Sequence, residues 1–157
     1  MIKCGSVIIR SNEVRDIFYK TKFIKNKEIF GLSGDPFQLG KMTERVCVAV
    51  AELRKKYKDK TIDLRKWLEM DDCVYVGRRG RIFINGEIFH YKDSVWKNDF
   101  TVKDHGRDEC LELYTEQIVK KIKDGTVNLE TIRGKKLGCF CKPGEKCHVD
   151  VLIRLLE

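Results

Sequence analysis

Three cysteines and a histidine are clustered near the C-terminus, as Cys139, Cys141, Cys147 and His148. Thiolates and imidazoles are common zinc ligands, and a cysteine beside a histidine can also act as a nucleophile with its base. If Cys139 and Cys141 lie on one strand, both side chains point to the same face, because side chains alternate along a strand. Residues 142–146 can then turn the chain so that Cys147 and His148 begin the last helix, whose dipole favours a thiolate.

These residues support three hypotheses. The first is a zinc site with Cys139, Cys141, Cys147 and His148 as ligands, in which the C-x-C spacing is tighter than the usual C-x₂₋₄-C. The second, which we take as the leading one, is a ligand pocket near the helix N-terminus, with Cys147 or His148 as nucleophile or acid–base group. The third is structural, with thiols packed in a core and a capping histidine. Asp150 either stabilises the first turn of the helix or orients His148.

The charge of the chain is compatible with anionic partners and does not decide between them and simple solubility. Residues 1–60 carry 14 lysines and arginines against 7 acidic residues, which accounts for most of the net charge of +8. A second group of basic residues lies between residues 133 and 146, where Glu145 is the only acidic residue. The group consists of Arg133, Lys135, Lys136, Lys142 and Lys146. Such surroundings suit a thiolate or a bound phosphate, and the N-terminal excess suits a polyanion or simply solubility.

The seven cysteines indicate a reducing environment. An odd number cannot all pair within one chain, and residues 1–6 lack the apolar stretch of a secretory signal. No run of about 18 apolar residues is present, so we expect no membrane contact and a cytoplasmic location. The other four cysteines stand alone among apolar neighbours, and we expect small core side chains at Cys4, Cys47, Cys73 and Cys110.

Apolar and turn residues predict strands that alternate with helices. Strands are expected at residues 6–10, 29–32, 61–64, 73–76 and 136–141, with a turn at 34–36. Asn85-Gly86, between residues 82–84 and 88–90, predicts a hairpin because both turn positions need a positive φ. Helices are predicted from Thr43 to Tyr57, from about 108 to 124 with Gly125 as the stop, and over 149–156.

This order of elements predicts an α/β fold, with a small single sheet, flanking helices and a strand–loop–helix site at the C-terminus. We expect residues 1–60 to be a basic segment packed on or extending the domain, and residues 61–157 to be the α/β domain itself.

Several ordered motifs resemble an uncharacterised domain family of phages, bacteria and large DNA viruses. The stretches 137–143 and 147–152 resemble the family pattern L-x-C-W-C-x-P…C-H-G-D-x-L, while 74–78 resemble its strand ending in Gly-Arg and 96–100 its Asn-Pro-Phe element. The resemblance covers about residues 61–157. Phe140, Asp99 and Val149 replace the family's Trp, Pro and Gly.

The resemblance implies functional roles at matching positions. It nominates Gly77, Arg78, Asn98 and Phe100 for ligand binding, Cys147, His148 and Asp150 for catalysis, and the three cysteines with His148 for metal. Arg78 could bind a phosphate or carboxylate through its planar fork, or be a solvated arginine. Asn98 could recognise a base or cap a turn. A viral member would be found in the host cytoplasm or the virion.

Two further patterns concern nucleotides and nucleic acids. Residues 29–41 resemble the phosphate-binding turn of nucleotidyltransferases, but Gln38 and Lys41 stand where that motif has histidines. Residues 18–27 interleave aromatic and basic side chains, which can bind single strands or simply join the core. We therefore expect a nucleotide- or nucleic-acid-directed domain. The alternative is a non-enzymatic, zinc-stabilised protein associated with nucleic acid or the virion.

Overall fold

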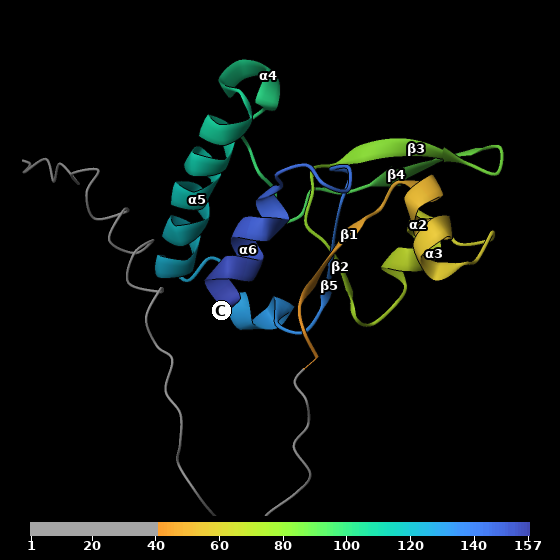
Figure 1. The fold of residues 1–157 in the computed structure, drawn as a ribbon, viewed down its shortest axis with the longest axis horizontal. Coiled ribbons are helices and arrows are strands. Elements are labelled where there is room, and N and C mark those ends of the chain that lie inside the picture. The colour runs from red at the N-terminus through yellow and green to blue at the C-terminus, as the bar shows by residue number, and fades with distance from the viewer. Residues whose placement is uncertain (1–40) are drawn as a thin grey trace, which may run out of the picture. The chain divides into compact units, whose positions relative to one another are not determined.

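The computed structural model describes residues 41–157 (Figure 1). The strands predicted at 6–10 and 29–32, the turn at 34–36, the aromatic and basic stretch 18–27 and all of the 29–41 motif except Lys41 lie outside the described residues.

A three-stranded parallel sheet forms the centre of the described fold. Its spatial order is β1 (Glu44–Cys47), β5 (Lys136–Cys139) and β2 (Cys73–Tyr75). β5 pairs on both sides: Cys139 lies opposite Cys47 of β1, and Gly138 lies opposite Tyr75 of β2. Because the strands are parallel, their C-terminal ends share one edge, where ligands bind in open α/β sheets.

Helices cover both faces of this sheet. α2 (Val50–Tyr57) and α3 (Leu64–Leu68) lie on one side, and α5 (Arg107–Lys123) and α6 (His148–Leu156) lie on the other (Figure 1). Two shorter elements, α4 (Val102–His105) and a 3₁₀ turn (Leu129–Ile132), complete this part of the chain. None of the helices in residues 41–157 is long and apolar enough to cross a membrane.

The core is divided by the sheet into two clusters, because side chains alternate along β5. Leu137 and Cys139 pack with α5 and α6 in one cluster. Gly138 faces the other, where Trp67 packs with Val46 and Val48. Since β1 and α2 precede residue 61, part of the basic N-terminal segment belongs to this fold.

The predicted hairpin is confirmed. β3 (Gly80–Ile84) and β4 (Glu87–Tyr91) pair antiparallel, and Asn85 and Gly86 have φ values of +50° and +90°. Among the described residues the hairpin pairs only with itself, so the α/β class is confirmed with two small sheets in place of a single one. The helices predicted at 108–124 and 149–156 and the strand at 73–76 are confirmed to within one residue.

Two predicted elements are wrong, and one is shorter than predicted. The helix expected from Thr43 begins only at Val50, because pairing with β5 holds residues 44–47 as a strand. No strand forms at 61–64; instead, the carboxylate of Asp63 accepts a hydrogen bond from the amide of Lys66 and caps α3. The last strand stops at Cys139, beyond which neither β1 nor β2 continues the pairing.

The close packing of Gly138 generates a stability prediction. A Cβ at this position would lie 2.4 Å from the ring of Trp67 and 2.6 Å from Val48. We expect Gly138→Ala to lower the free energy of unfolding by about 1–3 kcal/mol, measured by urea denaturation. Ala51→Leu, which adds carbons at an exposed position of α2, should change it by less than about 0.5 kcal/mol. Equal losses in both variants would contradict the tight contact.

Candidate functional site

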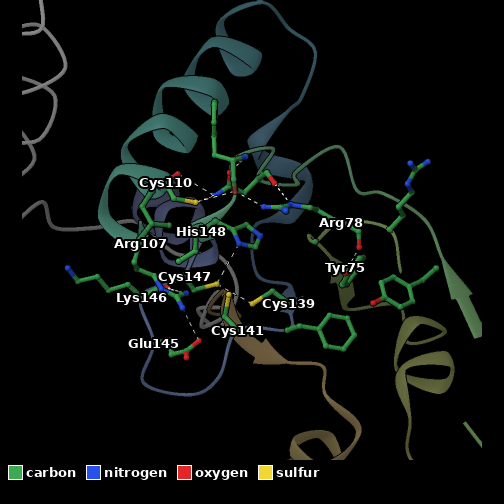
Figure 2. A pocket seen from close by; sticks show the side chains of 18 residues that line it. Tyr75, Arg78, Arg107, Cys110, Cys139, Cys141, Glu145, Lys146, Cys147 and His148 are labelled. Carbon is green, nitrogen blue, oxygen red and sulfur yellow. Dashed lines mark hydrogen bonds and ion pairs between the residues drawn. The ribbon is translucent and has the colours of Figure 1, made fainter. Parts of the chain in front are cut away.

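A cavity of about 500 Å³ opens where β2 and β5 end (Figure 2). It brings together all the residues predicted to bind a ligand or metal, which are Gly77, Arg78, Asn98, Phe100, Cys139, Cys141, Cys147 and His148. Asp150 is not part of its lining.

The sulfurs of Cys139, Cys141 and Cys147 meet at one wall of this cavity (Figure 2). All three lie within 4.8 Å of one another, and the Sγ atoms of Cys139 and Cys147 are 3.1 Å apart. None of the six cysteines in the described residues forms a disulfide. Cys139 and Cys147 are each 1% exposed, whereas Cys141 is half-buried and faces the cavity.

His148 is held with one ring nitrogen toward this cluster. Its Nε2 lies 3.0 Å from the carbonyl oxygen of Val76, and its Nδ1 lies 3.7 Å from the Sγ of Cys147. A carbonyl oxygen can only accept a hydrogen bond, so Nε2 carries a proton. When the ring is neutral, the lone pair of Nδ1 therefore points toward the sulfur of Cys147. The ring of Tyr114, at 5.3 Å in an edge-on arrangement, completes the buried environment.

In the absence of a cation, the electrostatics of the cluster favour a thiolate at Cys141 beside a protonated His148. Hydrogen bonds to Cys141 and Cys147, together with burial, raise the pKa of Cys139. Hydrogen bonds from Cys139, Cys147 and His148 lower the pKa of Cys141. Burial lowers the pKa of His148, but hydrogen bonds to Cys141 and Cys147 raise it more, to about 9. A bound dication would stabilise the thiolate form of all three cysteines.

Cys147 also forms the N-terminal cap of α6. Its Sγ accepts a hydrogen bond from the amide of Val149 at 3.4 Å, and its own amide donates to the carboxylate of Asp150 at 3.0 Å. This reciprocal pair is a capping box, which fixes the direction in which the chain enters the helix. Asp150 therefore stabilises the first turn of α6, and its hydrogen bonds go to Cys147 and Arg45 rather than to the ring of His148.

Arg45, which the sequence analysis did not select, holds the loop between the cysteines. Its Nη1 donates to the carbonyl oxygen of Glu145 at 2.8 Å and to Asp150 at 3.0 Å, and its Nη2 donates to the carbonyl oxygen of Lys142 at 2.7 Å. Burial lowers the pKa of Arg45, but the charges of Cys147 and Asp150 raise it above its ordinary value. No local signal could have identified Arg45, because its partners lie about 100 residues further along the chain.

Arg78 and Asn98 hold the opposite wall of the cavity. Arg78 donates from Nε to the carbonyl oxygen of Asn98 at 2.6 Å and from Nη2 to that of Phe100 at 2.5 Å. The side-chain oxygen of Asn98 accepts from the amide of Phe100 at 2.8 Å, and its nitrogen donates to Cys110. Asn98 is therefore buried in a turn. Gly77 lies so close to Tyr75 that a Cβ would be 2.5 Å from its hydroxyl oxygen.

The cavity lining is basic and aromatic. Its four cationic side chains face one carboxylate, that of Glu145, and they belong to Arg78, Arg79, Arg107 and Lys146. Phe140, which is 38% exposed, stacks on Tyr91 with ring centres 5.6 Å apart. Sequence reasoning missed Arg107 and Tyr91 because each comes from an element remote from the cysteines. Two members of the predicted basic group point elsewhere: Lys136 pairs with Asp72, and Arg133 with Glu130.

Comparison with known proteins confirms the resemblance inferred from the motifs. The family described as "Domain of unknown function (DUF4326)" matches residues 61–157. An uncharacterized 12.4 kDa protein in the nrdA-td intergenic region of Enterobacteria phage T4 is 34% identical over 71 residues, which cover 43% of this chain and 64% of that protein. Uncharacterized protein R718 of Acanthamoeba polyphaga mimivirus is 34% identical over 92 residues, covering 54% and 66%. The chain thus spans slightly less than two thirds of the length of each relative, and no solved structure matches.

The contacts of Arg45 generate a second prediction. Arg45→Met leaves the carbonyl oxygens of Lys142 and Glu145 and the carboxylate of Asp150 without this donor, so we expect a loss of about 2–4 kcal/mol in the free energy of unfolding. The matched control is Arg65→Met, which removes an exposed pair with Glu87 and should cost less than about 1 kcal/mol. Chemical denaturation measures both; similar losses would show that Arg45 does not hold the loop.

Proposed function

This chain belongs to the DUF4326 family, and we propose that it binds one zinc ion through Cys139, Cys141, Cys147 and His148, beside a pocket for a nucleotide. The observation that carries the metal proposal is the convergence of three sulfurs, beside a histidine whose Nδ1 lies 3.7 Å from the Sγ of Cys147 and whose Nε2 is already anchored.

The three sulfurs fit a tetrahedral zinc ion with small adjustments, and His148 would have to move toward them to be the fourth ligand. With Zn–S bonds of about 2.3 Å and a Zn–N bond of about 2.0 Å, sulfurs lie about 3.8 Å apart and nitrogen lies about 3.5 Å from sulfur. The distances of 3.1 Å between Cys139 and Cys147 and 3.7 Å between Cys147 and His148 lie within about 1 Å of these values. The hydrogen bond to Val76 is the kind of support that orients metal-binding histidines.

A four-ligand site of this kind would be structural, since no coordination position is left for substrate. It would join the end of β5, the following loop and the start of α6, and through His148 it would connect them to the residue after β2. The metal would then stabilise the wall of the cavity.

The competing proposal assigns catalysis to Cys147, His148 and Asp150. Two observations weigh against it: the thiol of Cys147 is 1% exposed and caps a helix, and Asp150 is bonded to Arg45 rather than to the histidine. A catalytic cysteine requires a thiolate that substrate can reach. The two proposals differ in whether the purified protein contains metal.

The zinc proposal is tested by elemental analysis of the purified full-length chain. We expect about one zinc per chain, retained in Cys73→Ser and lost in Cys141→Ser; both cysteines are half-buried, but only Cys141 is in the cluster. A chelator should lower Tm by about 10 °C or more, because the metal ties several elements together. A metal-free chain in which one cysteine is rapidly alkylated would support the catalytic proposal instead.

The nucleotide proposal rests on the composition and size of the cavity. A volume of about 500 Å³ is within the usual range for small-ligand sites. Cationic side chains outnumber acidic ones in the lining, and the partly exposed ring of Phe140 offers a surface for a base. Relatives encoded by phage T4 and mimivirus support a setting in the infected cell or the virion.

Calorimetric titration of the zinc-loaded chain with ATP tests this pocket. We expect Arg79→Ala to weaken binding about tenfold, since a charged hydrogen bond to phosphate contributes about 1.5 kcal/mol or more. Arg81→Ala is the control, because Arg81 lies on the neighbouring hairpin and does not line the cavity. Absence of heat with ATP in a zinc-loaded, folded chain would reject the nucleotide and leave the metal proposal intact.

A further inference from the structure

The outward face of the β3–β4 hairpin is exposed and has no partner among the described residues. The inward face, which includes Ile82 and Phe89, packs against the cluster around Trp67. The outward face carries two cross-strand pairs, Arg81 opposite His90 and Phe83 opposite Ile88. Phe83 is 71% exposed and Ile88 is 57% exposed. In Figure 1 the hairpin projects from the domain on the side away from α5.

Basic side chains predominate around this face, and one carboxylate at its edge, that of Asp93, accepts a hydrogen bond from the amide of Arg79. Behind the apolar pair lies the row of Arg81 and His90, and the exposed side chains of Arg79 and Lys92 flank the two strands. Glu87 lies opposite Ile84 on the inward face and pairs with Arg65. The outward face of the paired residues therefore presents an aromatic ring, an arginine and a histidine without a carboxylate.

We infer that this face, defined by Arg81, Phe83, Ile88 and His90, binds single-stranded nucleic acid. Arg81 would contact a phosphate, and the ring of Phe83 would stack on a base, which is how proteins bind single strands with little sequence preference. A duplex is a poorer partner, because its bases are already stacked on one another. A second copy of the chain is also a poorer partner, because each copy carries a net charge of +8. The inference goes beyond the zinc and nucleotide proposals and does not depend on either.

Fluorescence anisotropy with a labelled oligothymidylate and the full-length chain as purified tests this face. We expect Phe83→Ala to weaken binding about 5- to 160-fold, the range for loss of one base–aromatic stack, and Phe83→Tyr to retain it. Arg81→Ala should reduce the slope of log K against log salt by about 0.7, as expected for one phosphate contact to a single strand. Both side chains are exposed, so unchanged thermal melting will confirm that the variants fold.

Two controls make the result specific. Lys120→Ala removes an exposed cation from α5 and should leave binding unchanged. Arg107→Ala removes a cation of the cavity lining that belongs to α5 and not to the hairpin, so loss of ATP binding with retained oligothymidylate binding separates the two sites. The inference is supported if Phe83→Ala still weakens oligonucleotide binding in chains that have lost zinc or ATP binding.

Three outcomes overturn it. The first is equal oligonucleotide affinity in the wild type and Phe83→Ala. The second is binding that survives changes on the hairpin but disappears on charge reversal of Lys20, Lys22, Lys25 and Lys27 in the N-terminal segment. The third is a chain that dimerises through Phe83 and whose monomer and dimer bind the oligonucleotide equally well.

Discussion

The position of β5 between two parallel partners is the constraint on which the described structure depends. β5 has four residues and pairs with β1 on one side and with β2 on the other. Its Gly138 packs against Trp67, whereas Leu137 and Cys139 point into the core on the opposite face of the sheet. Both partner strands end opposite its last residues, so the chain must leave the sheet at Cys139. The loop and α6 then return beside the same edge, and this return brings Cys141, Cys147 and His148 to Cys139.

The elements around the cluster hold it from several directions. Arg45 of β1 binds the loop between the cysteines, Cys147 and Asp150 fix the start of α6, and the carbonyl oxygen of Val76 anchors the ring of His148. Metal ligands are effective when such surrounding contacts already set their orientation. The same contacts leave little freedom or exposure for a nucleophile at Cys147, and for this reason we propose coordination rather than covalent catalysis.

Aromatic side chains connect the cavity to the β3–β4 hairpin. Tyr91, the last residue of β4, packs edge-on against Tyr75 with ring centres 5.3 Å apart and stacks on Phe140 at the cavity wall. Tyr75 in turn donates a hydrogen bond to the carbonyl oxygen of Arg78. This aromatic group links the end of β4 to the end of β2 and to the residue that follows β5.

Sequence alone determined the elements whose signals lie within a few residues. Asn85-Gly86 specified a hairpin turn, the apolar spacing specified α5 and α6, and the spacing of the cysteines and His148 specified that they would share a site. Tertiary structure decided the rest. Residues 44–47 form a strand because β5 pairs with them, which outweighs their helical periodicity. Packing also brings together residues that are far apart along the chain. It adds Arg45, Arg107 and Tyr91 to the site, and it pairs Asp150 with Arg45 rather than with His148.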